Sequence, residues 1–387
     1  MATAELSKVD RIRQEFARDK AEMPVARTLR DIPAFYECIT PEWLTQVVRT
    51  RYPDATVTGC TLDARDSGTA NRRRIFLEYA PSDQSKGYPA TLFCKGSMDL
   101  LNRILMSTAA AKSEVLFYNE IRPKLEKIEA PTAYFAALDD TSYRSIVVLG
   151  DLAPEVTFCR HDTKITLERV QSQLSLLARM HGRYYQSPEL TTTLAGVDLF
   201  YDRFNRLDRE HGLAASCDKG LLMASEVMPE SVLARRAEVW PLTLQSVVRN
   251  RDLPRTLNHG DVHLKNWYLR GENQMGLNDF QVLNLGHWSR DVAYVLATAL
   301  DIEDRRKWER DLLAYYLDRL EEAGGKKESF EDSWTNYRQQ MFTVLAWWTI
   351  TMCPAGTMPD MQPVDTTLHF LRRIGQAMED LEVFDSF

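Results

Sequence analysis

Strand-like and helix-like segments are segregated along this 387-residue sequence, and this segregation limits the possible folds most strongly. Short apolar runs separated by turn-forming Ser, Gly, Pro and Asn residues are concentrated in residues 55–150. The five predicted strands are Ala55–Leu62, Arg74–Tyr79, Ala90–Cys94, Thr132–Leu138 and Ser145–Leu149. Strands gathered in one part of a chain and helices in the rest are typical of the α+β class, here with a five-stranded antiparallel sheet.

Helices are predicted before, within and after this strand-rich part. Apolar residues recur at helical spacing over residues 6–16, and Thr40-Pro41 is typical of the first turn of a helix that runs through Val48. One helix is expected between the strands, over Leu100–Leu125. Beyond Leu152 the chain is mainly helical, with a helix that begins near Thr166. The second part of the protein is therefore expected to be rich in α-helix.

The composition is that of a globular protein with no nucleic-acid partner. Hydrophobic residues make up 44% and charged residues 27%, while a net charge of −7 disfavours binding to a polyanion. Six cysteines lack any CxxC pair, which favours reduced thiols. Residues 1–20 lack the apolar run of a signal peptide, and no stretch is apolar enough for a membrane span. We therefore expect a cytoplasmic location.

Oxygen-bearing side chains are concentrated where the helical pattern breaks, between Leu257 and Phe280. His259–Asn266 reads His-Gly-Asp-Val-His-Leu-Lys-Asn, and Asp279 follows after an apolar run, a polar turn and a second apolar run. The two runs, Trp267–Leu269 and Met275–Leu277, are expected to pair as a hairpin and bring Asn266 close to Asp279. Irregular backbone within a helical part is a favoured place for a functional site.

These side chains suit a magnesium-dependent phosphoryl transfer. Mg²⁺ binds carboxylate and carbonyl oxygens together with phosphate oxygens, so Asn266 and Asp279 are candidate metal ligands. Asp261 is the candidate catalytic residue, because a carboxylate just upstream can accept the proton of an attacking hydroxyl or orient that hydroxyl toward the γ-phosphoryl group.

The spacing Asp261-x-x-x-x-Asn266, followed by Asp279-Phe280, resembles the catalytic and metal loops of the kinase superfamily. His-Gly-Asp instead of His-Arg-Asp is similar to the aminoglycoside phosphotransferase and choline kinase branch. The segments Asp279-Phe280-Gln281, Glu114–Tyr118 and Val148–Leu152 most resemble the ecdysteroid kinase-like group. The resemblance implies a protein-kinase-like fold of two lobes: residues 1–150, with the sheet and a nucleotide-covering loop, and residues 151–387, with both loops and an acceptor pocket.

The same resemblance implies a set of nucleotide-binding residues and the cofactors ATP and Mg²⁺. Lys95 would reach the α- and β-phosphates and pair with Glu114 on the following helix, and backbone groups near Leu149 and Asp151 would contact adenine. The segment implied to cover the phosphates contains Ser67, Gly68, Thr69 and Asn71. Taken singly, Ser67–Asn71 is more typical of a plain hairpin turn, Lys95 of a solvated strand end and Glu114 of an exposed helix position. Their order along the chain is what favours a nucleotide site.

Three further polar residues are interpreted as scaffold. His181 is more typical of a hydrogen-bonded core histidine than of a catalytic group. Asp291, at the start of a predicted helix, is expected to brace the catalytic loop, and His259 is expected to brace it as well. The sequence departs from the family pattern at Gly150, where an acidic residue is more usual, and at Gln281, where protein kinases have Gly.

The predicted function is ATP-dependent phosphorylation of a hydroxyl on a small molecule. The helical remainder, Ile302–Phe387, should complete the acceptor pocket. Four aromatic side chains and one methionine of this part either belong to the core or line an apolar pocket, and the latter favours a bulky, sterol-like alcohol. The residues in question are Trp334, Tyr337, Trp347, Trp348 and Met352. An aminoglycoside- or choline-type kinase acting on a polar or cationic alcohol is the alternative within the same class.

Two hypotheses of other classes stay open at this point. One is a metallophosphoesterase that would use His259, Asp261 and His263 as ligands of a two-metal site. The other is a kinase-fold module that binds nucleotide without transferring phosphate. The sequence predicts neither the oligomeric state nor a preference between ATP and GTP.

Overall fold

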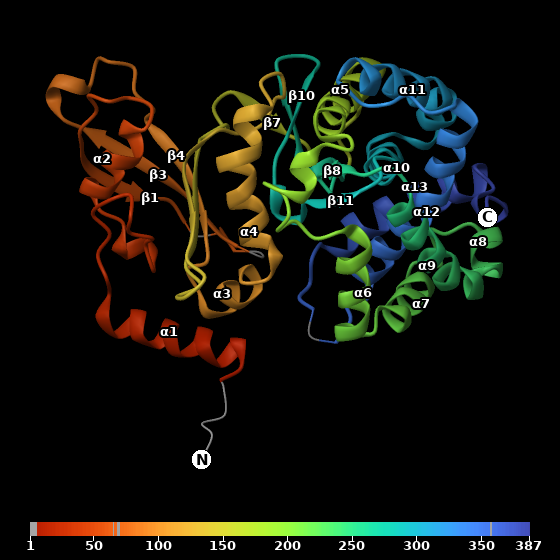
Figure 1. Cartoon of the computed structure of the whole chain (residues 1–387), viewed down its shortest axis with the longest axis horizontal. Coiled ribbons are helices and arrows are strands. Elements are labelled where there is room, and N and C mark those ends of the chain that lie inside the picture. Colours follow the sequence, from red (N-terminus) through yellow and green to blue (C-terminus); the bar gives the residue numbers. More distant parts are fainter. Residues whose placement is uncertain (1–5, 65, 68–69, 357) are drawn as a thin grey trace. The chain divides into compact units, whose positions relative to one another are not determined.

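The computed structural model describes residues 6–64, 66–67, 70–356 and 358–387 (Figure 1). It divides into two compact units. The first comprises Met1–Lys124 and Pro131–Pro154, and the second comprises Leu125–Ala130 and Glu155–Phe387. Each unit has its own buried side chains and is described by itself.

An antiparallel sheet is the centre of the first unit, with the strand order β1-β3-β4-β6-β5. All five predicted strands are confirmed, and the two-residue strand β2 (Asp66–Ser67) pairs in addition with β3. The bounds are β1 Val57–Leu62, β3 Asn71–Tyr79, β4 Thr91–Gly96, β5 Ala133–Leu138 and β6 Ser145–Gly150. Since β4 and β6 are flanked on both sides, their residues are largely buried, which explains their continuous apolar runs.

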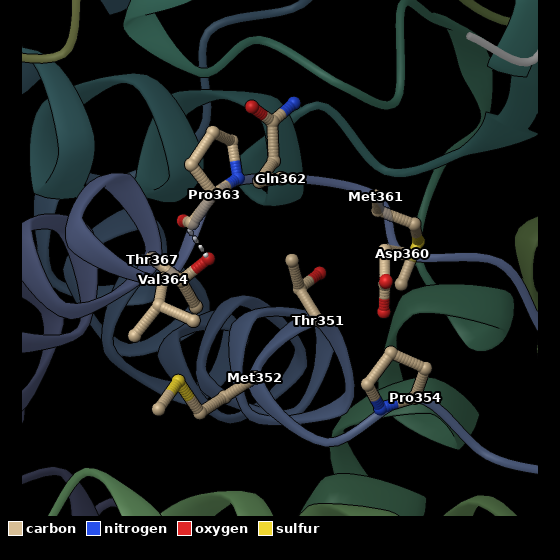
Figure 2. Close-up of a pocket in the computed structure, with 9 residues that line it drawn as sticks. All are labelled: Thr351, Met352, Pro354, Asp360, Met361, Gln362, Pro363, Val364 and Thr367. Carbon is tan, nitrogen blue, oxygen red and sulfur yellow. Dashed lines mark hydrogen bonds between the residues drawn. The ribbon is translucent and has the colours of Figure 1, made fainter.

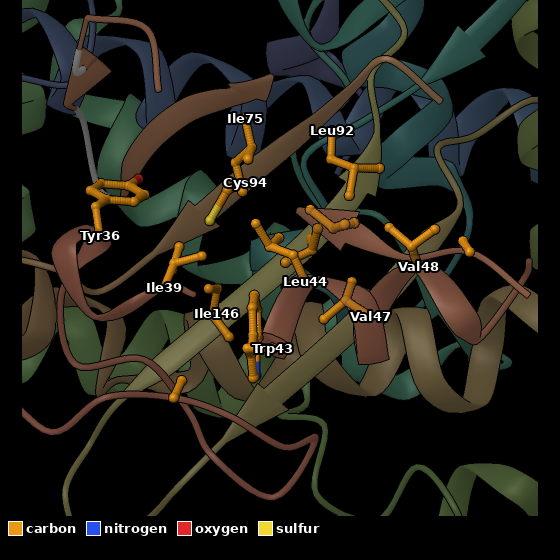
Figure 3. Close-up of a cluster of buried hydrophobic side chains, with 14 of the residues drawn as sticks. Tyr36, Ile39, Trp43, Leu44, Val47, Val48, Ile75, Leu92, Cys94 and Ile146 are labelled. Carbon is orange, nitrogen blue, oxygen red and sulfur yellow. The ribbon is translucent and has the colours of Figure 1, made fainter. Parts of the chain in front are cut away.

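Helix α2 (Pro41–Arg49) packs against this sheet. Thr40 caps it by accepting a hydrogen bond from the Trp43 amide at 3.1 Å, as the Thr-Pro signal predicts. Its apolar face, including Trp43, meets Ile75 and Cys94 of neighbouring strands (Figure 3). The first helix of the chain, α1, spans Lys8–Glu22 and begins at the N-cap Ser7. The amphipathic sequence of α2 therefore accounts for the hydrophobic cluster between this helix and the sheet of the first unit.

The single helix predicted over Leu100–Leu125 is wrong, because the structure breaks it. Helix α3 (Leu100–Met106) ends before its C-cap Ser107, and α4 (Ala109–Leu116) begins after its N-cap Thr108. A π-helical turn follows at Phe117–Ile121. The hydroxyls of Ser107 and Thr108 donate to the carbonyls of Ile104 and Leu105, both at 2.7 Å. These local bonds compete with the backbone bonds of a continuous helix.

The second unit is mainly helical, as predicted. Its helices are α5 Leu167–Tyr184, α6 Phe200–His211, α7 Leu213–Met223, α8 Glu230–Ala234, α9 Arg236–Asp252, α10 Ser289–Ala299, α11 Ile302–Glu322, α12 Phe330–Met352 and α13 Val364–Asp380. Every residue of α10 is buried, because α5, α11, α12 and α13 all contact it. Helix α10 is thus the central helix of this unit, and its first turn lies beside the candidate site.

Short strands support the irregular segment of the second unit. Strands β9 (Trp267–Arg270) and β10 (Gln274–Leu277) form the predicted hairpin, with Trp267 opposite Leu277, and β7 (Val156–Phe158) pairs with β9. Strand β8 (Thr256–Asn258) pairs with β11 (Asn284–Gly286). Within the described ranges, the six cysteines are unpaired, and no helix is long and apolar enough to cross a membrane.

Candidate active site

Gly260 allows the loop after β8 to lie directly on the segment before β11. Its φ is 85°, and a Cβ there would lie 2.4 Å from Asn284 Nδ2 and 2.5 Å from the Val282 carbonyl oxygen. A side chain at this position would therefore be strained by the left-handed backbone conformation and would clash with the Asn284 side chain and with the Val282 backbone carbonyl. This close approach is a physical reason for the glycine in His-Gly-Asp.

Asp291, in the first turn of α10, clamps the same loop. Its carboxylate accepts backbone N–H bonds from His259 at 2.7 Å and from Gly260 at 3.1 Å, while His181 Nε2 lies 3.4 Å away. Burial alone would raise the pKa of Asp291, but His181 and the Arg290 guanidinium outweigh it and lower that pKa. Arg290 Nη1 also donates to the Gly260 carbonyl at 2.8 Å. The predicted bracing role of Asp291 is confirmed.

Three side chains hold the Asp261 carboxylate. Tyr294 donates its hydroxyl to Oδ1 at 3.0 Å, Asn266 Nδ2 donates to Oδ2 at 3.2 Å, and His263 Nε2 lies 3.5 Å from Oδ2. Burial by itself raises the pKa of Asp261, but the charge and hydrogen bond of His263, together with the hydrogen bond from Tyr294, overcome it and lower the pKa to about 2. The side chain keeps 25% of its surface exposed, so an ionised carboxylate faces solvent in a fixed orientation.

The backbone of Asn278 joins the catalytic loop to the metal loop. Its N–H donates to the Asn266 carbonyl at 2.9 Å, and its own carbonyl lies 2.9 Å from His259 Nε2. The other ring nitrogen of His259, Nδ1, accepts the Asp261 N–H at 3.2 Å, so Nε2 carries the proton. Asp279, the next residue, is thereby held beside Asn266, as the hairpin predicts.

The donor set of these two loops suits a hard cation. Asn266 uses its amide N–H₂ group on the Asp261 carbonyl and Oδ2, so its amide oxygen remains as a ligand. Asp279 has left-handed backbone angles, φ 65° and ψ 66°, a conformation that Asp and Asn tolerate better than other residues. No group of three His, Cys, Asp or Glu side chains that could hold a metal occurs among the described residues. A metal held here would need oxygen atoms from a bound phosphate as well.

This geometry counts against the phosphoesterase hypothesis. Both ring nitrogens of His259 are engaged with backbone groups of the two loops, so His259 is not available as a metal ligand. Burial also lowers the pKa of His259 and keeps the ring neutral. His259 is instead a brace, as the sequence suggested.

In the first unit, Lys95 at the end of β4 and Glu114 on α4 form the predicted ion pair. Nζ and Oε1 are 2.9 Å apart, and the side chains are only 9% and 1% exposed. A buried pair of this kind holds the ammonium group in one position. Lys95 lies near the end of β4, where the sequence predicts it.

The segment expected to cover the phosphates is described only in part. Gly68 and Thr69 lie outside the described residues, and the backbone of Ser67 belongs to β2, opposite Asn71. The Asn71 side chain is fully buried: its Oδ1 accepts the amides of Met98 and Asp99 at 2.8 and 3.0 Å. Asn71 thus fastens β3 to the turn before α3.

Leu149 and Asp151 lie at the end of β6. Leu149 is buried in that strand between Phe93 of β4 and Ala133 of β5. The Asp151 carboxylate accepts bonds from Arg74 Nε at 2.5 Å and from Thr91 Oγ1 at 2.8 Å. The Asp151 side chain is therefore bonded to residues of β3 and β4.

Sequence reasoning missed several residues of the site. Tyr294, Arg290 and Asn284 contact Asp261, Gly260 or the segment around them, and Arg203 of α6 lies near Asp261. One signal was available: Tyr294 is three residues after Asp291 on α10, so the two share a helix face. The positions of Arg203 and Asn284 depend on tertiary packing and carry no such signal.

Comparison with solved structures identifies the fold. Choline kinase from Cryptosporidium parvum Iowa II matches with a TM-score of 0.50 and 8% identity over 85% of this chain and 91% of that one. Plasmodium vivax ethanolamine kinase matches with 0.45 and 12%, covering 96% and 95%. A spectinomycin phosphotransferase solved with ADP and spectinomycin matches with 0.48 and 11%, covering 89% and 99%. The match to the choline kinase, at a TM-score of 0.50, shows that the protein has the kinase-like fold, with an antiparallel sheet and a mainly helical remainder.

The family follows from the sequence itself. Residues 71–327 match the model of the ecdysteroid kinase-like family, and this range is more than half of the chain. The chain therefore belongs to the ecdysteroid kinase-like family, as the sequence motifs predicted. No curated protein matches the chain significantly.

Proposed function

We propose that this protein transfers the γ-phosphoryl group of ATP to a hydroxyl group of a small molecule. One observation carries the proposal: Asp261 and Asn266 are hydrogen-bonded to each other on a loop that the Asn278 backbone fastens to Asp279. A proton acceptor and two oxygen ligands on fastened loops are what phosphoryl transfer between oxygens requires. Membership of the family supports the same class of reaction.

Each residue has a distinct part in this reaction. Asn266 and Asp279 would hold Mg²⁺, which when bound supplies positive charge to the phosphate oxygens. Asp261 orients the acceptor hydroxyl and takes its proton as the new O–P bond forms and the bond between the β–γ bridging oxygen and the γ-phosphorus breaks. Tyr294 and His263 keep the Asp261 carboxylate ionised and in place.

Lys95 is proposed to bind the nucleotide phosphates. We expect Lys95→Ala to raise the KM for ATP by at least about tenfold and to lower kcat, because a positioned charge on the α- and β-phosphates is lost. Steady-state ATP titration measures this effect. Lys112→Ala, an exposed lysine on the same helix as Glu114, is the matched control and should leave both constants unchanged. Equal KM values for the wild type and Lys95→Ala would contradict the assignment.

A pocket of about 400 Å³ at the ends of α12 and α13 is proposed as the acceptor site (Figure 2). Its wall residue Gln362 accepts a hydrogen bond from Lys265 at 2.7 Å, and Lys265 lies between Asp261 and Asn266 in the catalytic loop. The pocket is lined by Thr351, Met352, Pro354, Asp360, Met361, Gln362, Pro363, Val364 and Thr367. This volume lies within the range of small-molecule sites.

The lining favours an apolar alcohol, such as a sterol-like molecule, over a polycation. Met352, Met361 and Val364 supply adaptable apolar surface, and Asp360 is the single carboxylate among the lining residues. An aminoglycoside would call for several acidic groups. Of the aromatic residues considered from the sequence, Tyr337 and Trp348 are core residues, being 0% and 1% exposed.

Narrowing this pocket tests the acceptor proposal. We expect Val364→Trp to raise the KM for the acceptor by about tenfold or more, since an indole would occupy part of the volume, with the KM for ATP unchanged. Val248→Trp, another exposed valine, on α9, is the control. If both variants keep the wild-type acceptor KM, the acceptor binds elsewhere.

The proposed activity can be tested without knowing the acceptor. ATP consumption is measured across a library of sterols, amino alcohols and aminoglycosides, with binding of ATP and Mg²⁺ followed by thermal shift. Turnover that requires both ATP and a hydroxyl compound supports the proposal. Binding of nucleotide without turnover for any compound would favour a non-catalytic module, and release of phosphate from esters without ATP would favour a phosphoesterase.

A further inference from the structure

The first turn of α6 is fastened to the segment that follows the metal loop. Leu199 forms a parallel bridge with Leu285 of β11, and the Leu285 N–H donates to the Asp198 carbonyl at 2.9 Å. The Phe200 ring lies 4.4 Å from the Arg290 guanidinium, which itself holds the Gly260 carbonyl. Helix α6 is therefore positioned by both loops of the candidate site.

Arg203 lies one turn further along α6, on the same side as Phe200. Its Nη1 is 3.5 Å from the Leu283 carbonyl, four residues after Asp279, and this long contact is the one hydrogen bond of its guanidinium within the described ranges. In the same part of the chain no carboxylate lies within ion-pair distance of it, whereas the neighbouring Arg206 pairs with Asp198. A half-buried guanidinium with five donors is thus left with a single weak bond.

Two of the charged residues that act on Arg203, Asp261 and Arg290, are residues of the candidate active site. Asp198 and Asp261 attract it, while Arg206 and Arg290 repel it. Burial lowers the pKa of Arg203 to about 10, which still leaves the group positively charged at neutral pH. Since Asp198 is neutralised by Arg206, and Asp261 is held by Tyr294, Asn266 and His263, neither carboxylate is paired with Arg203. A half-buried cation without an ionic partner among the described residues is a favourable place for an anionic ligand.

We propose that Arg203 is a further catalytic residue, which binds the oxygens of the γ-phosphoryl group as that group moves from ATP to the acceptor. This inference rests on the proposed kinase function. The O–P bond to the acceptor forms, the bond between the γ-phosphorus and the bridging oxygen breaks, the hydroxyl proton goes to Asp261, and ADP leaves. Arg203 neutralises negative charge on the oxygens of the transferring group and exchanges no proton.

The alternative ligand for this arginine is an anionic group on the acceptor. The location favours the phosphoryl group, because Arg203 contacts the end of the metal loop and lies within electrostatic reach of Asp261, the two places between which that group must pass. The acceptor pocket at α12 and α13 is lined by other elements. ATP hydrolysis without acceptor separates the two ligands, since water then replaces the hydroxyl.

The test compares Arg203→Gln with Arg209→Gln, an exposed arginine on the same helix, in ATP hydrolysis and in transfer to the best alcohol. We expect Arg203→Gln to lose about 100-fold in kcat for both reactions, with the KM for ATP within about threefold, and Arg209→Gln to keep its activity. Guanidinium ions should partly restore Arg203→Ala, which a purely structural role would not allow. A loss confined to transfer, or no loss, overturns the proposal.

A binding experiment makes failure of this inference distinguishable from failure of the kinase function. Aluminium fluoride with ADP and Mg²⁺ mimics the transferring phosphoryl group, and it should raise the Tm of the wild type beyond ADP and Mg²⁺ alone. Arg203→Gln should keep the ADP shift and lose the added increment. If the wild type itself shows no increment and no turnover, the kinase proposal fails. If Arg203→Gln keeps the increment, the role of Arg203 is refuted.

Discussion

Asp261→Asn is expected to abolish nearly all phosphoryl transfer while leaving ATP binding largely intact. Asparagine keeps the shape of the side chain and can still accept a hydrogen bond from Tyr294, but it cannot take the hydroxyl proton. Loss of such a group lowers kcat by about 10²- to 10⁴-fold. Single-turnover transfer with the best alcohol, together with ATP titration by thermal shift, measures both effects.

The matched control is Asp252→Asn, an aspartate of the same unit that pairs with the adjacent Arg251 on the surface. It changes the net charge by the same amount and should leave kcat unchanged. A pKa of about 2 makes Asp261 a weak base that is ionised at neutral pH, so in the proposed reaction we expect its largest contribution to be to orient the hydroxyl and to take the proton late. Turnover by Asp261→Asn close to that of the wild type would remove the mechanism.

Most of the fold could be predicted because its signals are local. The strands of the first unit alternate with turn residues, the Thr40 and Thr166 caps mark helix starts, and the hairpin follows from two apolar runs around a polar turn. The break at Ser107–Thr108 was missed because helix periodicity continues across it. The helix is interrupted where the Ser107 and Thr108 hydroxyls bond to the carbonyls of Ile104 and Leu105, and the spacing of apolar residues does not predict these bonds.

The site could be predicted only where spacing along the chain fixes it. Asp261, Asn266 and Asp279 occur within 19 positions, and their loops are joined by backbone bonds that the hairpin imposes. Arg203 is far away in sequence and reaches the loops only through packing of α6 on β11. For Tyr294 the sequence offers only its place on the same helix face as Asp291, and the contact of its hydroxyl with Asp261 is seen only in the folded structure.

Asp291 holds in place the loop that carries the candidate catalytic residue Asp261. Its carboxylate satisfies two backbone donors of the His259–Gly260 turn, and Gly260 has no room for a side chain. The position of Asp261 thus depends on a carboxylate that need not touch any substrate. A buried ion that accepts several N–H bonds is costly to replace, which explains why an ionised group is kept in the interior.

The second large effect is expected for Asp279→Asn, which should impair use of Mg²⁺. Asparagine tolerates the left-handed backbone at this position, so the loop should keep its conformation, whereas alanine would add backbone strain. The lost carboxylate removes a negative charge that a divalent cation requires. We expect kcat to fall by about 10³-fold and the Mg²⁺ concentration for half-maximal rate to rise at least about tenfold.

Metal binding itself can be followed without turnover, by the electron paramagnetic resonance signal of Mn²⁺ in the presence of ADP. Asp279→Asn should bind Mn²⁺ more weakly than the wild type, and Asp261→Asn should bind it with nearly wild-type affinity, because Asp261 is assigned to the proton and not to the metal. Glu272→Gln, an exposed carboxylate in the β9–β10 turn, controls for net charge. If Asp261→Asn lost Mn²⁺ while Asp279→Asn kept it, the roles of the two carboxylates would have to be exchanged, and the proton acceptor would be sought on the metal loop.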